Sequence, residues 1–138
     1  MKRYLLSVIF WAFTFGSDSF AASNDKLPVG TYSYSQSGDE LIDGSKASIT
    51  WSIVVNGNGK AEVNISALHA PYTCDGIYTI TDKGDYFALG LTDDENSLMD
   101  CDTPSPQFLL KKSFHGDVLV KSELFPWDSA GWKKMHKK

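Results

Sequence analysis

Residues 47–67 alternate apolar and polar side chains with a period of two. In residues 47–55 every odd position is apolar, and residues 60–67 alternate in the same way. The intervening residues 56–59 contain two Asn-Gly pairs, which tolerate the positive φ angles that a tight hairpin turn requires. Because a period of two places alternate side chains on opposite faces of a strand, this segment predicts a β-hairpin with one buried face.

Further segments have the composition of strands bounded by turn residues. They cover residues 29–35, 72–81, 86–91, 107–113 and 118–123, with two additional short strands expected around Leu41 and around residues 98–101. Residues 27–125 contain no sustained 3.6-residue period, which disfavours helices. Strands joined by short turns pair as antiparallel neighbours. The sequence therefore predicts an all-β fold, an antiparallel meander of seven or eight strands that closes into a small barrel, with a two-sheet sandwich as the alternative.

The C-terminal region has a different pattern. A short helix can begin at Pro126 or Asp128, which would pack Trp127 and Trp132 on the rim or open end of the barrel. Four lysines lie in the last six residues: Lys133, Lys134, Lys137 and Lys138. We expect a short C-terminal helix or tail here, with these lysines disordered and solvated.

The first 21 residues have the pattern of a secretory signal peptide. Lys2 and Arg3 precede a largely apolar run at residues 4–16, and small residues lie at 19 and 21 before the expected cleavage point. A transmembrane anchor is the alternative, but the run is shorter than the roughly 18 residues that it needs. No cysteine follows for lipid attachment. We expect residues 22–138 to form one soluble periplasmic domain without a membrane anchor.

Cys74 and Cys101 both remain after cleavage. Two cysteines in a short exported chain predict one disulfide bond. This bond would close a 28-residue segment and stabilise the fold by roughly 3 kcal/mol in the chain-entropy model. The sequence contains no C-x-x-C or H-x-x-x-H pair, so a metal site built on these cysteines is disfavoured.

The charge of the expected domain is unevenly distributed. Residues 22–132 carry seven lysines against 16 acidic residues, a net charge of −9. Such a domain repels nucleic acid, since binding to it depends on neutralising phosphates. It attracts a cationic partner, although solubility alone also accounts for an acidic surface.

Residues 93–102 hold the densest chemical feature. Five carboxylates fall within these ten residues: Asp93, Asp94, Glu95, Asp100 and Asp102. A solvated loop, a surface for a basic protein partner and a calcium site are three interpretations, but the EF-hand spacing with its central glycine is missing. Attachment at Cys101 would stiffen the loop and lower the entropic cost of binding. We take these five residues as candidate partner-binding residues and expect no metal.

No catalytic motif is present. The sequence lacks G-x-S-x-G, and both cysteines are expected to be oxidised. His69, His115 and His136 fall in a predicted loop, a predicted turn and the tail. Acidic residues are plentiful enough for glycoside hydrolysis, but their positions single out no pair. We expect a protein that is not an enzyme and that needs no cofactor.

A secreted, single-disulfide β-barrel of this size resembles the small periplasmic C-type lysozyme inhibitors and, more loosely, periplasmic immunity proteins against cell-wall-degrading toxins. That inhibitor family presents a Ser-Gly-x-x-Tyr loop to the cleft of the enzyme. Residues 37–41, Ser-Gly-Asp-Glu-Leu, occupy a comparable early hairpin, with Leu41 where the family has tyrosine. The resemblance implies a role in partner binding for Ser37.

This resemblance implies a periplasmic protein that binds and inhibits a cell-wall-active enzyme. Two other functions remain open. Residues 30–32, Gly-Thr-Tyr, resemble the Gly-x-Trp of lipocalins, which carry small apolar ligands. A structural or envelope-stress protein is the third. A carrier would have an empty interior, whereas an inhibitor would have a packed interior and prominent loops.

Overall fold

The computed structural model describes residues 26–70, 73–92 and 101–138, which form strands and turns without a helix. Nine antiparallel strands make up one sheet. They are β1 (Gly30–Glu40), β2 (Lys46–Val55), β3 (Lys60–Leu68), β4 (Gly76–Asp82), β5 (Phe87–Leu91), β6 (Phe108–Lys112), β7 (Val118–Lys121), β8 (Lys133–Lys134) and β9 (His136–Lys137). Within this part of the chain no helix has the length and hydropathy of a membrane span. The all-β prediction is confirmed.

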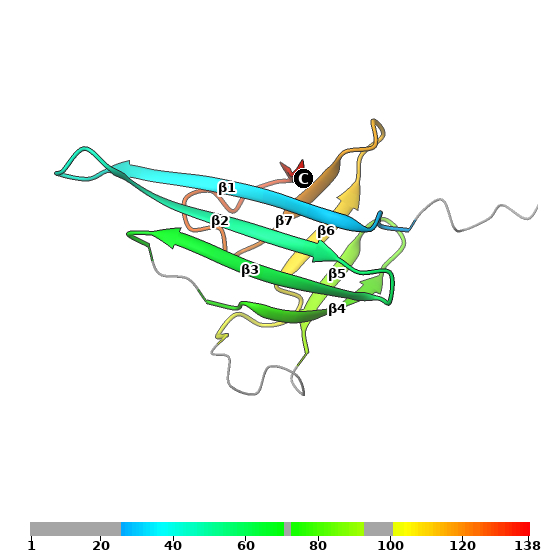
Figure 1. The fold of residues 1–138 in the computed structure, drawn as a ribbon. Coiled ribbons are helices and arrows are strands. Elements are labelled where there is room, and N and C mark those ends of the chain that lie inside the picture. The colour runs from blue at the N-terminus through cyan, green and yellow to red at the C-terminus, as the bar shows by residue number, and fades with distance from the viewer. Residues whose placement is uncertain (1–25, 71–72, 93–100) are drawn as a thin grey trace, which may run out of the picture.

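The C-terminal strands close the sheet into a barrel. The spatial order is β8-β7-β6-β5-β4-β3-β2-β1-β9, and only Met135 separates β8 from β9 in the chain. The Met135 N–H donates to the Val118 carbonyl over 2.9 Å, and the Lys138 N–H donates to the Thr31 carbonyl over 2.9 Å. One short segment thus pairs with β7 on one side and β1 on the other (Figure 1). The barrel, rather than the sandwich, is the observed architecture.

The alternating hairpin forms as predicted. Ile53 of β2 lies opposite Val63 of β3, and both side chains are fully buried. Alternate positions on each strand are buried, while those between them are more exposed. Full burial of one such side chain contributes about 1.5–3 kcal/mol, so the hydrophobic pattern fixes which face of the hairpin points inward.

Aromatic side chains fill one part of the barrel. Phe125, from the segment after β7, lies with its ring centroid 4.7 Å from that of Trp51 and 4.8 Å from that of Tyr34. Phe108 continues the cluster toward Tyr78, with centroids 5.5 Å apart in an edge-to-face arrangement. Phe108 and Tyr78 are completely buried. These aromatic side chains, with their aliphatic neighbours, form a packed core.

The meander sorts the connections between strands onto the two ends of the barrel. One end, the turn end, holds the tight turns 56–59, 83–86 and 113–117. At the opposite end, the loop end, lie the strand ends that flank the connections 41–45, 69–75, 92–107 and 122–132, three of which are the longest in the sequence. In Figure 1 the β1–β2 turn projects beyond the other strands at the loop end.

The structure corrects three expectations about local structure. Residues 125–132 form no helix, and the lysines at 133, 134 and 137 are part of β8 and β9 rather than a disordered tail. The reason is that the unpaired backbone groups of β1 and β7 bind this segment, and that Met135 enters the core. Around Leu41 the chain forms a turn, and β1 instead extends to Glu40.

Other expectations concern residues outside the described ranges. The signal peptide at 1–21 and the start of the domain at residue 22 lie outside them, as does most of the expected strand at 98–101. These stay predictions.

Met135 offers a test of barrel closure. Its side chain is only 4% exposed, so Met135→Ala is expected to lower the free energy of unfolding by about 2–5 kcal/mol. Urea unfolding of the 22–138 protein measures this loss. The exposed neighbour His136 provides the matched control, since His136→Ala should change stability by no more than about 0.5 kcal/mol. Equal stability of the two variants would contradict the docked C-terminal strand.

Candidate functional site

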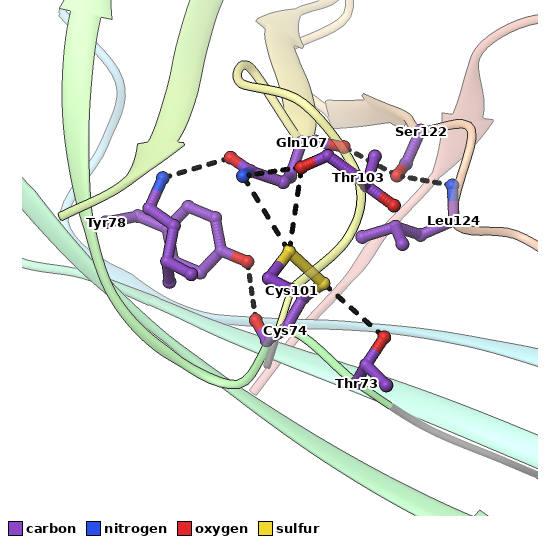
Figure 2. The surroundings of a disulfide bond; sticks show 9 residues. Thr73, Cys74, Tyr78, Cys101, Thr103, Gln107, Ser122 and Leu124 are labelled. Carbon is purple, nitrogen blue, oxygen red and sulfur yellow. Dashed lines mark hydrogen bonds between the residues drawn. A yellow bond between two sulfur atoms is a disulfide. The ribbon is translucent and has the colours of Figure 1, made fainter. Parts of the chain in front are cut away.

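The disulfide bond joins two of the four connections at the loop end. Cys74, in the 69–75 connection, is bonded to Cys101, in the 92–107 connection, as predicted (Figure 2). The Tyr78 hydroxyl donates a hydrogen bond to the Cys74 carbonyl in a buried position. Burial, with a smaller effect from the negative charge of Asp75, raises the pKa of Tyr78 well above its ordinary value. Tyr78 therefore stays protonated and keeps donating this hydrogen bond at any physiological pH.

Gln107 secures the end of the 92–107 connection. Its side chain, only 6% exposed, accepts a hydrogen bond from the Leu91 N–H over 3.0 Å and donates to the Thr103 carbonyl over 3.1 Å. The Ser122 hydroxyl donates to the Gln107 carbonyl over 2.6 Å (Figure 2). These bonds link the flanks of the 92–107 connection to the start of the 122–132 connection, and the disulfide bond adds Cys74 of the 69–75 connection.

A second buried glutamine holds the 122–132 connection against β1. Gln36 is 7% exposed; its amide donates to the Asp128 carbonyl over 2.9 Å, and its Oε1 accepts from the Trp127 N–H over 3.4 Å. The Trp127 indole lies directly over Gly38, where a Cβ atom would overlap the ring. Glycine at position 38 thus allows this approach, and Trp127 is fixed at the loop end.

Trp127 forms one wall of an open hollow of about 340 Å³. The hollow lies among the β1–β2 turn, the end of β3 and the 122–132 connection. Its lining is mainly apolar: Leu41, Ala47, Ile49, Ala70, Pro126 and Trp127, with Asp39 and His69 as the polar members. Apolar floors with a few polar groups are typical of sites that bind a ligand or a partner side chain.

The loop end concentrates the negative charge of the protein. Within residues 39–46, 73–75, 101–107 and 122–132, which the structure describes, there are seven acidic residues and one lysine, Lys46. Hydrogen bonds from the Ser45 hydroxyl and N–H hold the pKa of Asp43 below its ordinary value. Hydrogen bonds from Lys133 and the Ala130 N–H lower the pKa of Asp128. Both carboxylates therefore remain ionised under mildly acidic conditions.

The predicted partner-binding residues are only partly described. Ser37 is exposed on β1, and Asp102 is exposed in the 92–107 connection, so both lie toward the loop end although β1 and β6 are not neighbours in the sheet. Four others fall outside the described residues: Asp93, Asp94, Glu95 and Asp100.

Sequence reasoning missed the residues that build the hollow. Gln36 and Gly38 carry no signal of a pairing with Trp127, which lies about 90 residues away in the chain. Exposed Ile42 lies in the β1–β2 turn, whereas the sequence predicted a short strand around the neighbouring Leu41. The three histidines are dispersed: His69 lies at the loop end, His115 in a turn at the opposite end, and His136 in β9.

Across residues 26–70, 73–92 and 101–138, no group of three or more histidine, cysteine or acidic residues is arranged to hold a metal ion. No family model, curated protein or solved structure matches the chain. The candidate site is therefore defined by its geometry alone.

Gly38→Ala tests the contact with Trp127. The added Cβ would overlap the indole, so the ring must move, at an expected cost of about 1–3 kcal/mol and with a shift of the tryptophan fluorescence. Gly57→Ala is the matched control, because its Cβ would meet only Val29 at an ordinary 3.7 Å. The assignment is wrong if the spectrum and stability of Gly38→Ala match those of the control.

Tyr78→Phe tests the hydrogen bond to the disulfide-bonded segment. Loss of the hydroxyl leaves the buried Cys74 carbonyl without this donor, with an expected cost of about 1–2 kcal/mol at neutral pH. Because the folded pKa of Tyr78 lies above the unfolded value, its contribution is complete below the ordinary pKa of 10.0 and is lost as the pH rises toward the folded pKa. Urea unfolding measures this effect: the difference in the free energy of unfolding between wild type and Tyr78→Phe should be smaller at pH 11 than at pH 7.

Proposed function

We propose that this chain is a periplasmic binding protein that inhibits a cell-wall-active enzyme. It acts either as an immunity protein against a delivered peptidoglycan-targeting toxin or as a lysozyme-type inhibitor. The docking surface is the loop end, and the partner presents a positively charged cleft. The chain catalyses no reaction in this role and requires no cofactor.

The observation that carries the proposal is the concentration of acidic residues at one end of a barrel with a packed core. Of the eleven acidic residues that the structure describes, seven lie at this end, although they are spread over the sequence from residue 39 to residue 128. An acidic end steers a basic partner toward it and orients the encounter. An enzyme that acts on an anionic polymer needs a basic cleft to bind it, and such a cleft is complementary to this acidic end.

Rigidity at the loop end supports an inhibitory role. The disulfide bond, Gln107 and Gln36 together hold the described parts of three of the four connections, residues 73–75, 101–107 and 122–132. A surface that is already ordered loses little conformational entropy when it docks, which favours tight binding. The disulfide bond is also compatible with an oxidising compartment such as the periplasm, where an enzyme that attacks peptidoglycan has to be met.

The carrier function receives less support. The barrel interior holds Tyr78, Phe108, Ile53 and Leu89, all completely buried. Side chains fill the space that a lipocalin-like carrier would keep for its ligand. This packing favours recognition through the outer surface.

An inhibition assay with charge variants tests the proposal. The 22–138 protein is titrated into purified C-type lysozyme and into peptidoglycan hydrolase toxins, and their activity on cell walls is measured at low and at high salt. We expect inhibition of at least one enzyme, with Asp43→Asn/Asp102→Asn weakening it by about 3- to 10-fold at low salt.

Turn-end variants provide the matched control. Asp82 accepts a hydrogen bond from the N–H two residues ahead, as Asp43 does, so Asp82→Asn/Asp85→Asn removes the same charge from a comparable turn. This variant should inhibit as wild type does. Failure to inhibit any of the enzymes, or equal losses from both pairs of substitutions, would refute the proposal.

A further inference from the structure

We infer that the hollow beside Trp127 receives an apolar side chain of the partner, from a segment that also presents lysine or arginine to Asp39 and the acidic residues next to it. This inference rests on the proposed function, because it specifies the partner chemistry of the same end of the barrel. The occupant is a peptide segment of a protein, and the anchor is an aromatic or branched aliphatic residue.

The size and lining of the hollow define the anchor. Its volume of about 340 Å³ is at the lower end of the range for ligand pockets, and suits a single large side chain better than a lipid. Ala47 and Ile49 of β2 are buried and form a floor, and Ala70 packs partly against the core. An inserted apolar group would therefore contact apolar atoms and displace water.

The wall of the hollow is held in place before binding. Trp127 is packed on Gly38, and its backbone N–H donates to Gln36, whose amide also donates to the Asp128 carbonyl. An aromatic wall fixed by two neighbours on β1 does not have to be ordered when the partner arrives. Preformed aromatic pockets of this kind are where binding energy concentrates at protein interfaces.

Exposed apolar side chains extend the hollow outward. Leu41, Ile42 and Trp127 are 37%, 109% and 38% exposed, and Leu68 at the end of β3 is 51% exposed. Among the described residues, these four belong to a set of six exposed large hydrophobic residues, so most of that set lies at the loop end. A grouping of exposed apolar residues with a polar rim marks an interaction site rather than a solvated surface.

The charges around the hollow select the partner. Asp39 lines it, and Glu40 and Asp43 follow in the adjoining turn. The basic groups nearby are His69, in the lining, and Lys46, which lies opposite Glu40 in the strand register. Three carboxylates against one lysine leave a negative rim, which is complementary to lysine or arginine flanking the anchor.

A peptide selection tests the inference without a known partner. A library of random 12-residue peptides is displayed and selected on the 22–138 protein. We expect enriched peptides to carry an aromatic or branched aliphatic residue within two positions of a lysine or arginine. Enrichment of peptides without basic residues, or no enrichment, would overturn the inference.

Synthetic versions of the enriched peptides then locate the site by fluorescence anisotropy. Ala70→Phe fills the hollow and should weaken binding at least tenfold, and Asp39→Asn should weaken it about threefold. If Ala70→Phe does not fold, Leu41→Ser replaces it as the hollow variant, with the same direction of change. Phe114→Ser and Asp85→Asn, both at exposed positions of the turn end, should stay within twofold of wild type.

The outcomes separate this inference from the proposed function. Peptide binding that depends on Ala70 and Asp39, without inhibition of any cell-wall enzyme, supports the inference and refutes only the proposed function. Enzyme inhibition that is unaffected by Ala70→Phe and by Leu41→Ser refutes only the inference. Binding of the apolar dye ANS to wild type with displacement by none of the peptides would assign the hollow to a small molecule and overturn the inference.

Discussion

Backbone pairing of the last strand segment is the constraint on which the barrel depends. A meander that begins with β1 and ends with β7 has two edges, each with unpaired N–H and carbonyl groups. The segment that contains β8 and β9 pairs with both edges, and Met135 between them enters the core. Its lysines tolerate this position because Lys134 and Lys137 are exposed to solvent and Lys133 is paired with Asp128. Closure thereby fixes how the 122–132 connection approaches β1.

The arrangement of the loop end depends on this closure of the barrel. Once β8 follows β7 around the barrel, Phe125 can pack on Trp51 and Tyr34, and the next residues reach Gln36. Two buried glutamines and one disulfide bond then support connections that are too long to be ordered by tight turns. Buried amides are stable only when their donors and acceptors are used, so each glutamine fixes the backbone groups that it binds. This arrangement fixes the parts of these connections that the structure describes.

Negative charge and exposed apolar groups meet on that surface. Charged groups are well solvated in water, whereas exposure of leucine, isoleucine and tryptophan side chains to water is unfavourable in free energy unless a partner covers them. Their coincidence at the loop end, which holds four of the six exposed large hydrophobic residues among those described, is the physical basis for assigning recognition to this end. Long-range attraction and a short-range apolar anchor are complementary contributions to binding.

Local sequence was sufficient for the strands but insufficient for the site. The period of two at residues 47–67, the Asn-Gly turn and the two cysteines determined the hairpin, the all-β class and the disulfide bond, because these depend on side-chain alternation and on local backbone preference. The sequence did not predict the strand segment at 133–137, because its two-residue elements are too short to show an alternating hydrophobic pattern. They form only because the edge strands β1 and β7 have backbone groups left to pair. The placement of Trp127 over Gly38 likewise joins residues about 90 positions apart. Only the tertiary structure decided it, since contacts across a barrel follow from strand order and closure rather than from neighbouring residues.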